Sequence, residues 1–138
     1  MITYLDTSAL LRAVLREKGA LDDLRDVRPL LSSELLAIEP YRVIDRHRLD
    51  GMLSTEEAAS RRETVSEWLE AVDLVLLQRP ILARASEPFP TPLGTLDALH
   101  LATALVWRDR HGEDLVVATH DQQLADAARA FSFAVRGA

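Results

Sequence analysis

Hydrophobic positions along the chain fall into two alternating patterns. Short apolar runs rich in strand-forming residues are separated by longer segments in which apolar residues recur at helical spacing. The runs predict strands at residues 2–5, about 30–32, 74–77 and 115–118, and a last edge strand is expected within 131–135. The third and fourth runs are apolar throughout, which is typical of strands buried on both faces of a parallel sheet.

The segments between these runs carry helix start and stop signals. Ser54 followed by Glu57 has the spacing of a capping box, so a helix is predicted over 54–71. Thr95 is expected to cap a helix that runs to about Arg110 and that Gly112 ends. The other expected elements are helices over 8–15, from the second strand to about 49, and over 122–130, and a proline-rich loop over 88–92.

Strands that alternate with helices predict an α/β protein whose central parallel sheet of four to five strands lies between helices. A length of 138 residues suits one domain, residues 1–138. No apolar run approaches the roughly 20 residues of a membrane span, and the first residues lack the basic head of a secretory signal. The absence of cysteine excludes disulfides and thiolate metal sites. These features together favour a cytoplasmic protein.

The formal net charge of −6 argues at first against a nucleic-acid partner. Lys18 is the one lysine among the 16 basic residues, and the others are arginines. Arginine binds phosphate bidentately, whereas lysine acts as a point charge. A GC-rich genome would produce the same bias. Net charge also hides placement, since acids can cluster in a metal site while arginines line its rim.

Four acids occupy positions where α/β proteins build ligand sites. Asp6 and Asp121 each follow a predicted strand, and ligands bind outside the carboxyl ends of such strands. Asp97 lies in the first turn of a helix among apolar neighbours. Glu39 lies on an apolar helical stripe, which indicates that its carboxylate faces the interior.

Each acid also has a simpler interpretation. Asp6, Asp97 and Asp121 could each cap a helix, because a carboxylate accepts bonds from the free N–H groups of the first turn. Glu39 could pair with Arg42. The combination favours a site, because clustered carboxylates raise one another's pKa and hard divalent cations relieve the repulsion. A bound cation lowers the pKa of water and stabilises a leaving oxygen, which is the chemistry of phosphodiester hydrolysis.

Four segments occur in the order and spacing of one known family. The chain resembles the PIN-domain nucleases, specifically the VapC-type toxins of bacterial toxin–antitoxin pairs. The resemblance covers nearly the whole chain, and it includes a serine six residues before the glutamate. The four matching segments are Tyr4–Leu10, Ser33–Glu39, Leu96–Ala104 and Val117–Ala125.

The resemblance implies a three-layer PIN-like fold and an endoribonuclease that depends on Mg²⁺ or Mn²⁺. It makes Ser8 and Thr119 supporting polar residues that hydrogen-bond within the site. It also implies a cognate antitoxin protein that blocks the pocket, and a homodimer. The acids that it assigns to the metal site and to catalysis are Asp6, Glu39, Asp97 and Asp121.

Several nearby residues receive less direct interpretations. Pro40 disfavours a continuous helix through Glu39, so either the helix kinks there or Pro40 opens a new helical segment. His100 shares a helix face with Asp97, and a packed, hydrogen-bonded histidine is favoured over a ligand because oxygen ligands suit Mg²⁺. Glu34 is expected on the surface rather than as a fifth acid of the site, Asp126 as a solvated acid, and His120 pointing away from Asp121.

Two surfaces carry a structural and a functional interpretation. Arg42 and Arg46 belong to a basic cluster with His47 and Arg48, which is either a solvated face paired with neighbouring acids or a phosphate-contacting surface beside the site. The amphipathic segment 52–69 is expected to pack on the core. A surface for a helix of the antitoxin is the alternative.

Three other functions place acids at strand ends or keep the same fold. A phosphotransfer receiver domain needs a lysine near the last strands, and the only lysine is Lys18. A haloacid-dehalogenase-type phosphatase needs an aspartate two residues after Asp6, where Ser8 stands. A catalytically silent PIN-like interaction module that binds a partner protein remains the alternative to the nuclease.

Overall fold

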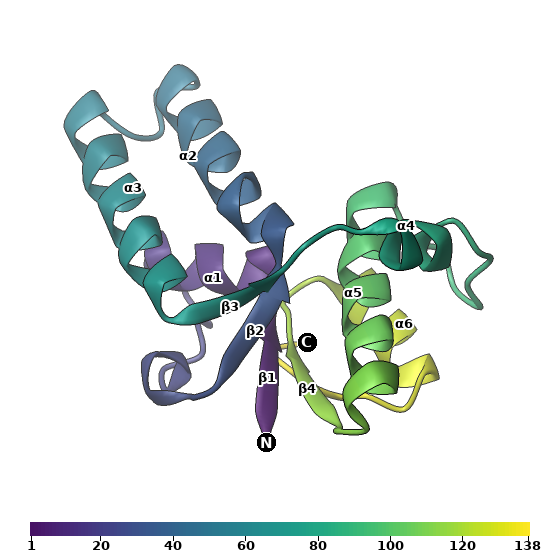
Figure 1. Cartoon of the computed structure of the whole chain (residues 1–138). Coiled ribbons are helices and arrows are strands. Elements are labelled where there is room, and N and C mark those ends of the chain that lie inside the picture. The colour runs from purple at the N-terminus through teal and green to yellow at the C-terminus, as the bar shows by residue number, and fades with distance from the viewer.

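The computed structural model describes all 138 residues, and its centre is a five-stranded sheet (Figure 1). The strands are β1 (Ile2–Leu5), β2 (Leu30–Ser33), β3 (Val72–Val75), β4 (Leu115–Ala118) and β5 (Ala134–Arg136). Their order is β3-β2-β1-β4-β5, and every neighbouring pair is parallel. The predicted parallel sheet of four to five strands is confirmed. Because the strand order reverses at β1, ligands are expected beside the ends of β1 and β4.

Six α-helices cover the two faces of this sheet. In Figure 1, α1, α2 and α3 lie on one side, and α4, α5 and α6 lie on the other. No helix combines the length and apolar character that a bilayer span requires. The helices are α1 (Thr7–Val14), α2 (Glu39–Leu49), α3 (Thr55–Glu70), α4 (Arg79–Ala85), α5 (Thr95–His111) and α6 (Gln122–Ala130), with 3₁₀ turns at Leu24–Asp26 and Glu34–Ala37.

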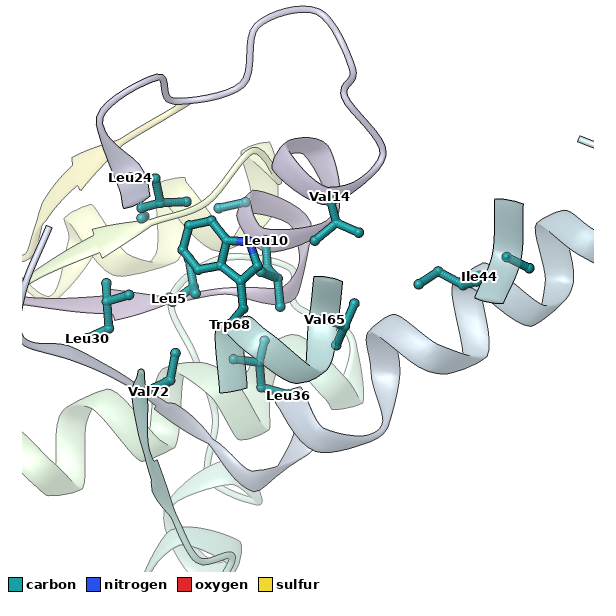
Figure 2. Close-up of a cluster of buried hydrophobic side chains, with 13 residues drawn as sticks. Leu5, Leu10, Val14, Leu24, Leu30, Leu36, Ile44, Val65, Trp68 and Val72 are labelled. Atoms are coloured by element: carbon teal, nitrogen blue, oxygen red, sulfur yellow. The ribbon is translucent and has the colours of Figure 1, made fainter. Parts of the chain in front are cut away.

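The sheet separates two hydrophobic clusters, one under each layer of helices. In the first, the Trp68 indole of α3 lies beside Leu10 of α1 and Leu5 of β1 (Figure 2). In the second, Leu101 of α5 and Leu124 of α6 pack against the opposite face. A fully buried leucine or valine stabilises the fold by roughly 1.5–3 kcal/mol. These clusters therefore fix α5 and α6 on one face and α1 and α3 on the other.

Two predictions about local structure are wrong, and one helix was missed. The third strand is β3, which begins two residues earlier than predicted, and its Asp73 is exposed because β3 is an edge strand. Gly94, and not Thr95, is the N-cap of α5, and no side chain caps this helix. Helix α4 was not predicted, because its seven residues are too few for a periodic pattern and Pro80 lies in its first turn.

Other local signals are confirmed. Ser54 and Glu57 form the reciprocal capping box of α3, with both hydrogen bonds at 3.0 Å. Gly112 ends α5 in the left-handed conformation with φ +62°. Pro40 is the second residue of α2, where a backbone N–H is not needed, so it opens a new helical segment after the 3₁₀ turn. Glu39 consequently lies at the very start of α2.

Candidate active site

The four acids come from four elements that meet at the carboxyl end of the sheet. Asp6 follows β1, and Asp121 lies three residues after β4, whose last residue is paired with the last residue of β1. Asp97 lies in the first turn of α5, and Glu39 begins α2. The fold therefore brings together residues that are up to 115 positions apart, counting from 6 to 121.

Asp6 is buried, and its two carboxylate oxygens have different surroundings. Oδ2 accepts hydrogen bonds from the Ser8 hydroxyl at 2.5 Å, the Thr119 hydroxyl at 2.8 Å and the Ser8 backbone N–H at 3.3 Å, which caps α1. Oδ1 lies 3.7 Å from Nε2 of His100. Helix capping thus occupies one oxygen and leaves the other directed toward the remaining site residues.

Asp121 is held by the same polar network. Its Oδ1 accepts from the Leu124 N–H at 2.9 Å and caps α6, while its own N–H donates to the Thr119 hydroxyl at 3.0 Å. The Ser8 hydroxyl also accepts from the His120 N–H at 2.9 Å. Ser8 and Thr119 therefore link the segments that follow β1 and β4, and their hydroxyls hold Asp6 and Asp121 beside each other.

Glu39 is fixed by a chain of buried polar groups that the sequence did not predict as a unit. Its Oε1 accepts from the Thr7 hydroxyl at 2.8 Å and lies 2.6 Å from Nε2 of His100. Nδ1 of His100 is 2.7 Å from the Tyr4 hydroxyl, which accepts from the Ser33 N–H at 3.1 Å. His100 is 1% exposed. The expected packed, hydrogen-bonded histidine is confirmed, and it contacts the site.

Tyr4 and Thr7 are the site neighbours that sequence reasoning missed. A signal was present for Tyr4, because a tyrosine in a buried strand needs a partner for its hydroxyl. Thr7 directly follows Asp6, but a threonine in the first turn of a helix is common and carries no specific signal.

The charges of these groups are coupled. Burial raises the pKa of Asp97 to about 6, and the negative charges of Asp121, Asp6 and Glu39 add to this against the opposing effect of His100. Burial opposes ionisation of Glu39, but the hydrogen bond with His100, the charge of His100 and the hydrogen bond from Thr7 together outweigh burial and lower the pKa of Glu39. Burial likewise disfavours the charged form of His100, yet the neighbouring carboxylates raise its pKa. The four acids therefore share one electrostatic environment.

The fit of these residues to a divalent cation depends on their spacing and on their chemistry. No three of the acidic or histidine side chains converge closely enough to form a ready-made metal-binding group. The donor chemistry nevertheless fits, because carboxylate oxygens are the ligands of hard cations and mutual repulsion already raises the pKa of Asp97. Asp97 does not cap its helix. The residues therefore suit Mg²⁺ or Mn²⁺ once the carboxylates draw together.

Residues around the site follow their expected places with one exception. Asp126 is an exposed acid that accepts from Gln122, and His120 contacts the carbonyl of Gly137. Glu34 was expected on the surface, but it is half-buried, and its Oε1 accepts from the Leu77 N–H at 3.1 Å. It therefore joins the start of the 3₁₀ turn to the chain after β3.

The basic cluster lies along α2. Arg42 is 3.6 Å from Asp45, which also pairs with Arg48 at 3.0 Å, so part of the cluster is the solvated, paired face that one interpretation predicted. Arg42 and Arg46 follow Glu39 by three and seven residues and therefore share its face of the helix. The surface formed by Arg42 and Arg46 therefore extends along α2 away from the four acids.

The molecule is an α/β protein whose parallel sheet has electrostatically coupled carboxylates beside the carboxyl ends of its central strands, where ligands bind in this class of fold. The PIN domain model matches residues 3–130, and the chain belongs to the PIN-domain family. It is also similar to Ribonuclease VapC46 of Mycobacterium tuberculosis, with 36% identity over 136 residues that cover 96% of this chain and 94% of that protein. The resemblance to VapC-type PIN ribonucleases is confirmed.

Proposed function

We propose that the chain is an endoribonuclease that hydrolyses RNA phosphodiester bonds with Mg²⁺ or Mn²⁺ and acts as the toxin of a toxin–antitoxin pair. The observation that carries the proposal is the electrostatic coupling of four carboxylates at one sheet edge in a PIN-domain chain. Its similarity to a protein named as a ribonuclease supports RNA as the substrate.

In this proposal, Asp6, Glu39, Asp97 and Asp121 are the catalytic acids and hold the cation. When bound, the cation would lower the pKa of the attacking water and stabilise charge on the leaving oxygen. Ser8 and Thr119 aim one oxygen of Asp6 by occupying the other. The same hydroxyl of Thr119 fixes the backbone of Asp121.

Glu39 and the basic face of α2 complete the proposed site. Glu39 is oriented through His100 and Thr7. Arg42 and Arg46 are proposed to contact phosphates on the RNA, since they lie about 4.5 and 10.5 Å along the helix from Glu39 at 1.5 Å per residue. Exposed arginines at this spacing could bind successive phosphates of an RNA backbone that extends from the cleavage point along α2.

The partners belong to the proposal as well. They are an RNA substrate, a cognate antitoxin protein that covers the acidic site, and a second copy of the chain in a homodimer. We place the protein in the cytoplasm, where its RNA substrates are, and treat residues 1–138 as one PIN-like nuclease domain. Growth arrest on induction, relieved by co-expression of a neighbouring reading frame, would support the toxin role.

The enzymatic proposal is tested with end-labelled RNA and purified protein. Cleavage is expected with Mg²⁺ or Mn²⁺ and not with EDTA. Asp6→Asn should remove it, while Asp22→Asn, which deletes an exposed carboxylate elsewhere, should leave it unchanged. Equal cleavage by the parent and Asp6→Asn would identify a contaminating nuclease and overturn the proposal.

The catalytically silent interaction module remains a second candidate. It is favoured by the engagement of Glu39 with His100 and Thr7 and by carboxylates that do not yet converge on one point. A parent protein that neither cleaves RNA nor binds Mn²⁺ in titration calorimetry, yet captures its partner, would establish this function instead.

A further inference from the structure

The last strand of the sheet contacts the loop that organises the acidic site. Strand β5 and the residues after it lie outside the segment that the PIN domain model matches, which ends at residue 130. The Thr119 N–H donates to the carbonyl of Arg136 at 3.0 Å. Nδ1 of His120 lies 2.8 Å from the carbonyl of Gly137, so this nitrogen is the donor. The 136–137 segment thus bonds two consecutive residues beside Asp121.

Gly137 is the point of closest approach between this segment and the loop. Its φ is +99°, a conformation that residues with a side chain rarely adopt. A Cβ at this position would lie 2.5 Å from the carbonyl oxygen of Thr119 and 3.1 Å from two atoms of the His120 ring. Since the nearest atom belongs to the backbone, either the Thr119 peptide or the backbone at residue 137 would have to move, and either movement would strain the Thr119–Arg136 hydrogen bond.

A movement of Thr119 would reach both strand-end acids. Thr119 is fully buried, and its hydroxyl donates to Oδ2 of Asp6 at 2.8 Å while accepting from the Asp121 N–H at 3.0 Å. A shift of a few tenths of an ångström would change the geometry of both hydrogen bonds. A buried site without room to relax transmits such a shift to its neighbours.

We propose that Gly137 is a positioning residue for the acidic site, because its close contact with the Thr119 peptide sets the spacing between the Asp6 and Asp121 carboxylates. The proposal rests on the proposed function only for its effect on RNA cleavage. Gly137 bonds none of the four acids directly, and it acts on them through Thr119.

The test compares Gly137→Ala with Gly51→Ala. Gly51 has a similar φ of +78°, but no atom lies within 4 Å of the point that a Cβ would occupy, so this variant carries the backbone strain without the contact. We expect Gly137→Ala to lower kcat and Mn²⁺ affinity by about tenfold with KM within twofold, in the range typical of residues that orient ligands. Gly51→Ala should match the parent in all three.

A double-mutant cycle separates positioning from general loosening. If Gly137 acts through the Thr119 hydroxyl, Gly137→Ala should change kcat by less than twofold in a Thr119→Val background. If the losses of kcat in the two single variants instead multiply in the double variant, Gly137 does not act through the Thr119 hydroxyl and the inference is overturned.

His120→Ala and His120→Asn provide a second probe that adds no Cβ at Gly137. The asparagine amide can replace the Nδ1 donor, so it should recover most of the Mn²⁺ affinity that the alanine variant loses.

Amide hydrogen exchange gives a readout that needs no enzymatic activity. The Asp121 N–H, bonded to Thr119, should exchange about tenfold faster in Gly137→Ala than in the parent or in Gly51→Ala. Unchanged exchange and Mn²⁺ affinity in Gly137→Ala would overturn the inference. If the parent fails to cleave RNA, but Gly137→Ala still differs from the parent in amide exchange and Mn²⁺ affinity, the proposed function alone is overturned.

Discussion

The two halves of the acidic site are held by different forces. At the strand ends, hydroxyls and backbone N–H groups occupy one oxygen of Asp6 and one of Asp121 at distances between 2.5 and 3.3 Å. At the helix starts, Asp97 caps nothing, and Glu39 depends on a buried histidine. The first half is fixed by hydrogen bonds from neighbouring residues. In the second half only Glu39 is held in this way, by residues distant in sequence, and Asp97 is governed by charge.

This difference assigns distinct properties to the two halves. Short hydrogen bonds to a carboxylate fix its orientation whether or not a cation is present. A carboxylate that is half-buried and faces like charges is destabilised until a cation arrives. The strand-end half therefore determines where ligand oxygens point, and Asp97 of the helix half determines how strongly the protein responds to pH and to metal.

The largest expected effect comes from breaking the strand-end half with Thr119→Val. This removes one hydrogen bond to the Asp6 carboxylate and leaves the Asp121 N–H unpaired in a part-buried position, at about 1–3 kcal/mol for each loss. We expect the free energy of unfolding to fall by about 3 kcal/mol in urea titration. Thr55→Val, at an exposed position, should stay within about 0.5 kcal/mol.

An intermediate effect is expected from Tyr4→Phe, which acts on the helix half. The change keeps the ring that packs edge-on to His100 at 5.8 Å, but removes the hydroxyl between His100 and the Ser33 N–H. We expect a loss of about 2 kcal/mol in the free energy of unfolding and a lower kcat because Glu39 is less well oriented.

The matched control for Tyr4→Phe is Tyr41→Phe. The Tyr41 hydroxyl bonds Ser66 at 2.7 Å on the surface, so its removal should cost less than about 0.5 kcal/mol. Equal losses in the two variants would show that the Tyr4–His100–Glu39 chain adds nothing beyond an ordinary tyrosine hydroxyl.

The two halves also differ in how far sequence could predict them. Asp6 and Asp121 could be assigned because each follows an apolar strand, and parallel strands end at the same sheet edge. Ser8 and Thr119, each two residues from one of these acids, were assigned by the resemblance to the PIN-domain nucleases. A local pattern therefore contained the two acids of the strand-end half, and the family resemblance added their hydroxyl partners.

The helix half depends on contacts that no local pattern records. Tyr4, Glu39 and His100 are separated by at least 35 positions, counting from 4 to 39, and only side-chain contacts between β1, α2 and α5 in the folded chain join them. Gly137 gave no signal either, because its importance depends on the Thr119 carbonyl opposite it. The early start of β3 was missed because Asp73 interrupts the apolar run at an edge strand.

The smallest effect is expected from Asp97→Asn in the metal-free protein, and it depends on pH. The pKa of Asp97 in the folded state is about 6, raised by burial and by its acidic neighbours from 3.8. The folded state binds the Asp97 proton more tightly than the unfolded state does. The resulting contribution to the free energy of unfolding is fully present below pH 3.8 and is lost as the pH rises through about 6. Asparagine cannot ionise, so the variant avoids this loss.

We therefore expect Asp97→Asn to be more stable than the parent by about 1 kcal/mol at pH 8, after the shift is reduced for solvent screening, and equal to it near pH 4. For a domain of this size, about 1 kcal/mol corresponds to roughly 3–5 °C in Tm, measurable by calorimetry in EDTA. Saturating Mn²⁺ should reverse the order, because the cation stabilises the parent through its extra carboxylate. A metal-free variant that melts below the parent at pH 8 would mean that Asp97 stabilises the start of α5 as Asp6 stabilises α1, and the contrast between the two halves would disappear.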